Sequence, residues 1–227
     1  YALYYTGLLW LYAAVRLRRR GVVLMYHRVL PAGADTYSHA GIVVTPETFE
    51  RQMAFLARHF RTLTQAQFRQ ELAASSFGRR ACLVTFDDGW WDNLEYALPV
   101  LKRHGVPAIV FVATGYVGTT DTFWQERLAR LVYLAAVRDG SDSGLLRDIG
   151  FGHASGVMPG HLRLRARQFV TSLKMQDPAA AWQVIERLQA ALRDVPESRE
   201  LGADRFMTWD EVNALRQDGQ VTIGSHA

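Results

Sequence analysis

A short apolar run that ends on two carboxylates constrains the fold of this chain more than any other feature. Ala81–Phe86 has the length and composition of a buried strand, and Asp87, Asp88 and Gly89 follow it directly. Two adjacent carboxylates at a buried strand end repel each other, so a cation is needed beside them, most simply a metal ion. The triplet alone also fits a plain turn, because Asp and Gly are common turn residues.

The residues after this strand complete a βαβ unit. Asp92 is predicted to cap a helix over about 93–104, which Gly105 ends. Pro107–Val112 is apolar and rich in β-branched residues, and is predicted to be the next strand. Parallel strands bring their carboxyl ends to one edge of a sheet, where catalytic groups lie in α/β proteins. This context favours a functional site over a plain turn.

Two further strands are predicted to bring histidines to the same edge. Gly21–Tyr26 is followed by His27, and Gln220–Ile223 leads to His226. A lone histidine is more often structural than catalytic, so the placement at strand ends is what makes these two candidates. A carboxylate and imidazoles around a divalent ion form a familiar hydrolytic site.

Helices are predicted around these strands. Thr45 caps a helix that runs to about His59, whereas capping boxes at Thr64 and Thr208 begin two more. About 85 residues, 121–205, interrupt the alternation of strands and helices, and we expect them to form a helical insertion. The expected parts of this insertion are a helix over 122–138 capped by Asp121, a mobile stretch over 139–160, a segment over 161–174 that becomes helical, and a helix from Pro178 to about Val195.

Residues 1–20 form a segment of their own. Tyr1–Val15 is aromatic and apolar, and four arginines follow it at positions 16 and 18–20. A run of about 15 residues is shorter than the ~20 that span a bilayer, whereas aromatic residues beside a basic cluster suit a membrane interface. We expect a membrane-associating helix, and an ordinary helix packed on the domain is the alternative.

Charge and cysteine content exclude some functions. The net charge of +4 is small and the basic residues are spread apart from 16–20, so nucleic-acid binding is not indicated. Cys82 is the single cysteine, which permits no internal disulfide. The chain begins on Tyr1 and stops at Ala227 just beyond a predicted strand, so we expect a fragment of a longer protein.

Several stretches jointly resemble the NodB-type polysaccharide deacetylases, a carbohydrate esterase family. They are Met25-Tyr26-His27-Arg28-Val29, Val84–Gly89, Tyr96–Leu101, Gly105–Val112 and Met207–His226. The resemblance implies an α/β fold, a distorted (β/α) barrel that is incomplete at the carboxyl terminus and carries the helical insertion. Residues 21–227 would form this deacetylase-like domain.

The resemblance also implies a reaction, the metal-dependent removal of N-acetyl groups from an amino-sugar glycan or a lipid-linked sugar. Asp87 would be the general base, and Asp88 and His226 would hold a divalent ion, for which zinc is the family's usual metal. The residues alone do not tell which aspartate does which. We expect His27, Gly89 and Trp90 to line the site. The family's second histidine and later motifs are absent from the chain, so we expect these 227 residues alone to bind zinc weakly and to be nearly inactive.

Two other functions stay open. A deacetylase-like module that binds a carbohydrate without chemistry would tolerate an incomplete metal site. A phosphate-transfer hydrolase would use Asp87 as the nucleophile with magnesium, although the other strand ends do not call for it. The sugar itself is open, and residues 1–20 favour a membrane-associated location in a bacterial cell envelope, on a side that stays undecided.

Overall fold

The computed structural model describes residues 20–140, 143–151, 159–174, 178–193 and 203–226, together with Thr6, Tyr12 and Val15. Most of the expected membrane-associating helix, 1–20, therefore lies outside the described residues. Within the described ranges, no helix is both long enough and apolar enough to cross a membrane. The chain divides into two compact units. The first comprises Tyr1–Ala34, Ile42–Thr119 and Phe206–Ala227, and the second comprises Asp35–Gly41 and Thr120–Arg205.

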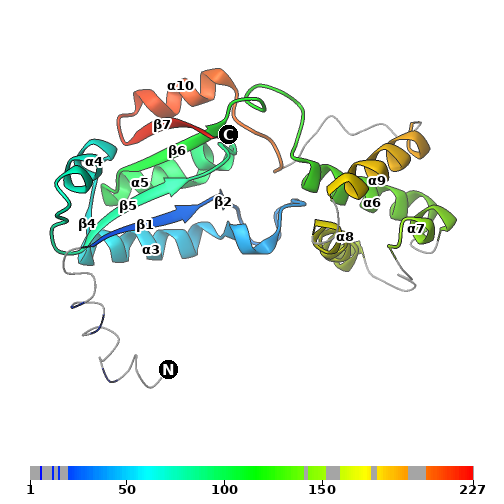
Figure 1. Cartoon of the computed structure of the whole chain (residues 1–227), viewed down its shortest axis with the longest axis horizontal. Helices are drawn as coiled ribbons and strands as arrows, with labels where there is room; N and C mark the ends of the chain where they lie inside the picture. Colours follow the sequence, from blue (N-terminus) through cyan, green and yellow to red (C-terminus); the bar gives the residue numbers. More distant parts are fainter. Residues whose placement is uncertain are drawn as a thin grey trace. The chain divides into compact units, whose positions relative to one another are not determined.

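A parallel sheet organises the first unit (Figure 1). Its strands are β1 (Gly21–Tyr26), β4 (Arg61–Thr62), β5 (Ala81–Phe86), β6 (Ala108–Ala113) and β7 (Val221–His226). The order is β1-β5-β6-β7, and β4 pairs with the first two residues of β5. Two short strands, β2 (Arg28–Val29) and β3 (Val43–Val44), form a separate parallel pair. All six residues of β5 are buried, as its central place in the sheet requires.

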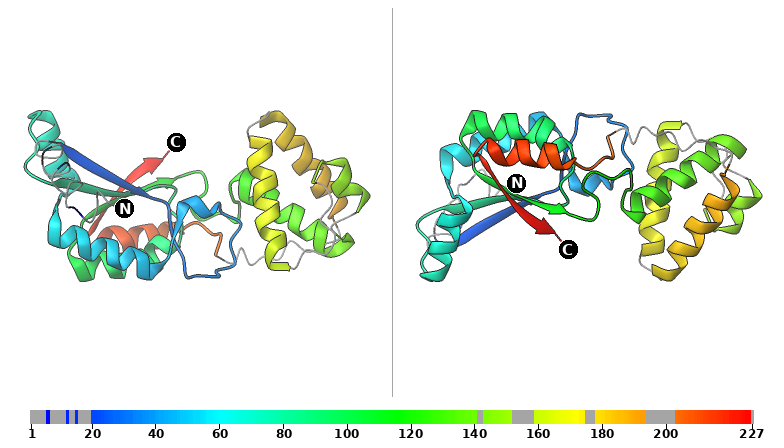
Figure 2. Two further views of the ribbon diagram at one scale, coloured as in Figure 1. Left: turned by 90° about the horizontal axis from the view of Figure 1, so that it is seen from below. Right: turned by 90° about the horizontal axis from the view of Figure 1, so that it is seen from above.

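Helices cover one face of this sheet. They are α3 (Pro46–His59), α5 (Leu98–His104) and α10 (Trp209–Gln217), which lie on the same side of the strands (Figures 1 and 2). Alternate side chains of β5 and β6 point into the core beneath them, because successive residues of a strand face opposite sides. A further helix, α4 (Gln65–Ala73), follows β4. The predicted caps are confirmed at Thr45, Thr64 and Thr208, and Gly105 ends α5 in the left-handed conformation.

The predicted fold class is confirmed as an α/β fold with parallel strands joined by helices. In the part of the chain that the structure describes, the sheet stays open instead of closing into a barrel, in keeping with the incomplete barrel expected. One boundary was wrong. β7 extends through Gly224 and Ser225 to His226, so this histidine ends the strand instead of following it.

The second unit is helical. Its helices are α6 (Trp124–Asp139), α7 (Gly144–Asp148), α8 (Pro159–Lys174) and α9 (Pro178–Ala191). One prediction was wrong here, since Phe123 stands at the cap of α6 in place of Asp121. The stretch expected to be mobile, 139–160, lies partly outside the described residues. Its described part contains α7, which Ser143 caps and in which the side chain of Leu146 is fully buried.

A short segment, 35–41, belongs to this second unit and is held in it by polar contacts. Its last residues begin the 3-10 helix η1 (Ala40–Ile42). Asp204 accepts hydrogen bonds from Thr36 Oγ1 (2.5 Å) and from the Tyr37 backbone N–H (2.6 Å). Ser38 Oγ donates to Glu126 Oε1 at 3.0 Å, and Arg167 Nη1 donates to the Ser38 carbonyl at 3.0 Å.

Candidate active site at the carboxyl end of the sheet

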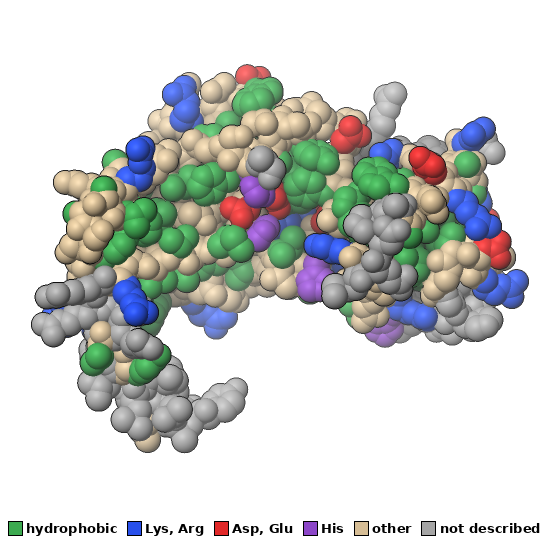
Figure 3. Space-filling model, in the orientation of Figure 1, with side chains coloured by type: hydrophobic (Ala, Val, Ile, Leu, Met, Phe, Trp, Pro, Cys, Tyr) green, Lys and Arg blue, Asp and Glu red, His purple; other side chains and the backbone are tan. Residues whose placement is uncertain are grey.

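The structure brings two of the predicted site residues together. Asp88 lies in the turn after β5, and His226 is the last residue of β7. Ala113 at the end of β6 links them, since it pairs with His226 in the sheet and its N–H donates to the Asp88 carbonyl at 2.9 Å. His226 Nε2 lies 3.6 Å from Asp88 Oδ1. Acidic and histidine side chains gather at this end of the strands (Figure 3).

The turn that carries Asp88 has an uncommon backbone. Asp88 and Gly89 both have positive φ angles, +76° and +81°. A Cβ atom on Gly89 would lie 2.8 Å from Val112 Cγ1, so a side chain does not fit at that position. For a non-glycine residue this conformation costs about 1–3 kcal/mol, and such strain gathers at functional sites. Hydrogen bonds hold the turn in place, from the Asp87 N–H to the Tyr26 carbonyl (2.9 Å) and from the Met207 N–H to the Gly89 carbonyl (3.1 Å).

The side chain of Trp90 contacts the carboxylate of Asp88. Its Nε1–H donates to Asp88 Oδ2 at 3.0 Å. The indole itself is 0% exposed and stacks on Phe206, with ring centroids 4.2 Å apart. The ring of Trp90 is buried, and its Nε1–H points at the carboxylate of Asp88, so the expectation that Trp90 lines the site stays a prediction.

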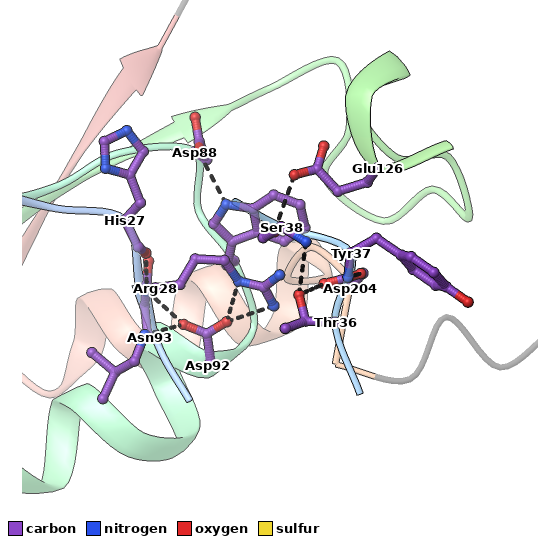
Figure 4. Close-up of polar contacts among 12 residues, drawn as sticks. His27, Arg28, Thr36, Tyr37, Ser38, Asp88, Asp92, Asn93, Glu126 and Asp204 are labelled. Atoms are coloured by element: carbon purple, nitrogen blue, oxygen red, sulfur yellow. Dashed lines mark hydrogen bonds and ion pairs between the residues drawn. The ribbon is translucent and has the colours of Figure 1, made fainter. Parts of the chain in front are cut away.

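A buried ion pair lies beside this tryptophan, and the sequence reasoning missed it. Arg28 donates through Nε and Nη2 to Asp92 Oδ2, at 2.9 Å each, and both residues are fully buried (Figure 4). The Val29 N–H donates to the other Asp92 oxygen at 2.8 Å. Asp92 stands at the N-cap position of the helix, as predicted, but its side chain makes no capping hydrogen bond. The helix instead begins with a π-helical turn, η2 (Asn93–Ala97).

His27 and Asp87 complete the predicted set, and both are half-buried. The His27 ring and the Asp88 carboxylate point to the same side, away from the Arg28–Asp92 pair (Figure 4). The backbone of His27 is anchored from below, since Asn93 Nδ2 donates to its carbonyl at 2.9 Å.

The geometry of Asp88 and His226 fits two ligands of one metal ion. Zinc lies about 2.0–2.2 Å from nitrogen and oxygen ligands in tetrahedral sites, which places two ligand atoms about 3.4 Å apart. The 3.6 Å between Nε2 and Oδ1 is close to that value. Among the described residues, no group of three or more His, Cys, Asp or Glu side chains is arranged to hold a metal.

Comparison with known proteins identifies the stretch that carries the acidic pair. Residues 74–144 match the family model "Polysaccharide deacetylase". Over this stretch the chain is similar to that family. The resemblance predicted from the sequence is therefore confirmed, and the matched stretch includes Asp87, Asp88, Gly89 and Trp90 but neither His27 nor His226.

Curated relatives extend this likeness over part of their own length. The poly-β-1,6-N-acetyl-D-glucosamine N-deacetylase of Staphylococcus epidermidis is 32% identical over 79 residues, which are 34% of this chain and 27% of the relative. The enzyme of the same name from Staphylococcus aureus is 30% identical over 107 residues, covering 43% of this chain and 37% of the relative. Among solved structures, the de-N-acetylase from Aggregatibacter actinomycetemcomitans aligns with a TM-score of 0.48 and 15% identity, over 91% of this chain and 54% of that one.

Proposed function

We propose that the protein is a metal-dependent hydrolase that removes N-acetyl groups from an amino-sugar glycan. The observation that carries this proposal is the convergence of Asp88 Oδ1 and His226 Nε2 to 3.6 Å at the carboxyl end of the sheet. Strand ends of parallel sheets are where α/β enzymes place their catalytic groups. The stretch that matches the polysaccharide deacetylase family model contains this aspartate, which supports the same reaction class.

Each residue of the site has a separate role in the proposed reaction. Asp88 and His226 would hold a divalent ion, with zinc as the first candidate because a carboxylate and an imidazole suit it. A bound divalent ion supplies polarisation of the acetyl carbonyl and a more acidic water. Asp87 is the proposed general base, since it adjoins Asp88 in the same turn and is accessible enough to accept a proton on its carboxylate from the attacking water. His27 lines the site at the end of β1.

The substrate class comes from the relatives and is part of the proposal. Two of them are named for the deacetylation of poly-β-1,6-N-acetyl-D-glucosamine, which makes a polymer of N-acetylated amino sugars the first substrate to test. A lipid-linked N-acetylated sugar is the second. A contact of residues 1–20 with a membrane, in a bacterial cell envelope, would place the enzyme where either substrate is made.

Acetate release tests this function. The protein, expressed from its own gene, is incubated with N-acetylglucosamine oligomers and Zn²⁺, Co²⁺ or Ni²⁺, and free acetate is measured. We expect turnover that a chelator abolishes. The Asp88→Asn variant should lose both metal and turnover, whereas Asp87→Asn should keep the metal and lose at least about 100-fold in kcat, the usual contribution of a general base.

An exposed carboxylate provides the matched control. Asp210, in the first turn of α10, is exposed, so Asp210→Asn should leave turnover unchanged. Acetate release that survives Asp88→Asn would contradict the proposal. Oligosaccharide binding without acetate release under any of the three metals would indicate a binding module instead, and magnesium-dependent phosphate release would indicate a phosphate-transfer hydrolase.

A further inference from the structure

The side chain of Trp90 is fixed on its ring and offers a single polar atom. Phe206 stacks on the indole with an interplanar angle of 19°, and the two residues also form an antiparallel bridge. The guanidinium carbon of Arg28 lies 4.1 Å from the centroid of the indole ring, within the range of a cation–π contact. Tryptophan has one polar group, the Nε1–H, which is a donor only. That donor is directed at Asp88 Oδ2.

The contacts behind Trp90 keep Arg28 in place. Asp92 accepts two hydrogen bonds from the guanidinium, and its other oxygen is held by the Val29 N–H. Because Arg28 and Asp92 are both fully buried, separating them would leave an uncompensated charge in the protein interior. The indole of Trp90 therefore packs against the guanidinium of Arg28, and moving that guanidinium away from Asp92 would be costly in free energy.

The arrangement has a direct effect on Asp88. A carboxylate rotates easily about its terminal bond, so a free side chain would present either oxygen to His226. The hydrogen bond from Trp90 occupies Oδ2, and Oδ1 is the oxygen that lies 3.6 Å from His226 Nε2. The two oxygens are thus assigned to different partners.

We infer that Trp90 is a positioning residue for the metal ligand Asp88, holding Oδ2 so that Oδ1 stays directed toward the ion shared with His226. This inference rests on the proposed function, because it requires Asp88 to bind a metal. Groups that hydrogen-bond to a metal ligand typically change metal affinity by about 10–100-fold when they are removed.

Metal affinity gives the first test. Co²⁺ binding to the protein expressed from its own gene is measured by titration calorimetry for the wild type and for Trp90→Phe, which removes the N–H and keeps an aromatic ring. We expect the Kd for Co²⁺ to rise about 10–100-fold. Trp182→Phe is the matched control, since Trp182 is 50% exposed on α9, and its Kd should equal that of the wild type. Asp88→Asn should abolish the binding.

A spectroscopic measurement that keeps Trp90 in place does not depend on how well the Phe variant folds. With ¹⁵N-labelled tryptophan, the indole N–H resonance of Trp90 should shift when Zn²⁺ is added and when Asp88 is replaced by Asn. The indole resonance of Trp182 should not move in either case.

The possible outcomes distinguish a failure of the inference about Trp90 from a failure of the proposed metal-dependent function. The metal site stands if the wild type binds Co²⁺ and Asp88→Asn does not. In that case the inference is overturned if Trp90→Phe binds Co²⁺ as tightly as the wild type and the indole resonance of Trp90 does not shift when Zn²⁺ is added. If Asp88→Asn binds Co²⁺ as the wild type does, or if neither binds it, the proposed metal site fails and the inference fails with it.

Discussion

At the scale of single residues, the turn after β5 depends on a glycine that has no room for a side chain. Gly89 has a φ of +81°, and a Cβ there would meet the side chain and the backbone of Val112. Gly105 also has a positive φ, +62°, but a Cβ on it would meet no atom within 4 Å. A substitution at Gly105 therefore costs free energy through the backbone conformation alone, whereas a substitution at Gly89 also costs free energy through overlap with Val112.

Gly89→Ala should therefore destabilise the protein more than Gly105→Ala does. The backbone term alone is worth about 1 kcal/mol for Ala at Gly105. Overlap with Val112 adds about 1–3 kcal/mol at Gly89. Urea unfolding of the two variants measures the difference, and equal costs would show that the overlap is relieved without strain.

The buried ion pair permits a second comparison between residues. Asp92→Asn leaves the Arg28 charge buried without its counter-charge, which costs about 3–5 kcal/mol. Lys102 and Asp218 form a pair of similar length, 2.6 Å, but the lysine is largely exposed. Asp218→Asn should therefore cost less than about 1 kcal/mol. Denaturant midpoints of the two variants check this order, and a small loss for Asp92→Asn would mean that water reaches Arg28.

Asp92 also marks what the sequence could and could not predict about the site. The acidic pair and both histidines were found from their places after apolar runs, and the structure puts them at one edge of the sheet. Arg28 and Asp92 were missed because they are separated by more than sixty residues, and an Asp before a helix is most simply interpreted as a cap. Recognising the pair required knowing that the ends of β1 and β5 are neighbours.

At the scale of elements, helix signals were dependable where the capping residue had no competing partner. Thr45, Thr64 and Thr208 each cap a helix as predicted. Asp92 stands at the N-cap position, but its carboxylate makes no capping hydrogen bond, because it accepts hydrogen bonds from Arg28 and the Val29 N–H instead. The short α7 was missed because its glycine- and serine-rich surroundings hide the contribution of buried Leu146. Local sequence signals predict a helix well unless residues distant in the sequence bind the side-chain atoms on which the signal depends.

The central strand carries a prediction about pH. Burial raises the pKa of Cys82 to about 11 from 9.0. It also raises that of Tyr26 to about 12 from 10.0, with a smaller contribution from Cys82. Both groups lose their protons more readily in the unfolded chain, so the stability that they confer is complete below about pH 9 and is lost as the pH rises toward 12. Unfolding free energies at pH 8 and pH 11 should differ less in Cys82→Ala than in the wild type.

The same burial makes Cys82 a probe of the strand. Its thiol should resist an aromatic disulfide reagent in the native protein at pH 8 and react fully in 6 M guanidinium, because the side chain is fully buried and protonated. Rapid labelling of the native protein would show that β5 opens.

At the scale of the whole molecule, the first unit has an outer strand with exposed apolar side chains. Within the described ranges β1 pairs with β5 alone, and Val23 and Met25 are 50% and 61% exposed. An apolar edge strand is a site at which sheets associate.

Met25→Lys should therefore lower any self-association of the chain, because a charged side chain on an edge strand opposes pairing. Val137→Lys places the same change at a residue that is 60% exposed on α6, and it should have no such effect. Size-exclusion chromatography over a range of concentrations distinguishes them, and equal behaviour of the two variants would exclude β1 as the contact.

Segment 35–41 has a consequence for anyone who wishes to excise the helical unit or exchange it with a relative's. Residues 120–205 cannot be removed alone without loss of hydrogen bonds. Their partners outside this range are Thr36, Tyr37 and Ser38, which bond with Asp204, Glu126 and Arg167. A deletion that joins 119 to 206 would leave these polar groups of 35–41 without their hydrogen-bond partners. An exchange that moves 120–205 together with 35–41 would keep both partners of each hydrogen bond, so the helical unit has to be transferred as two separate segments of the chain.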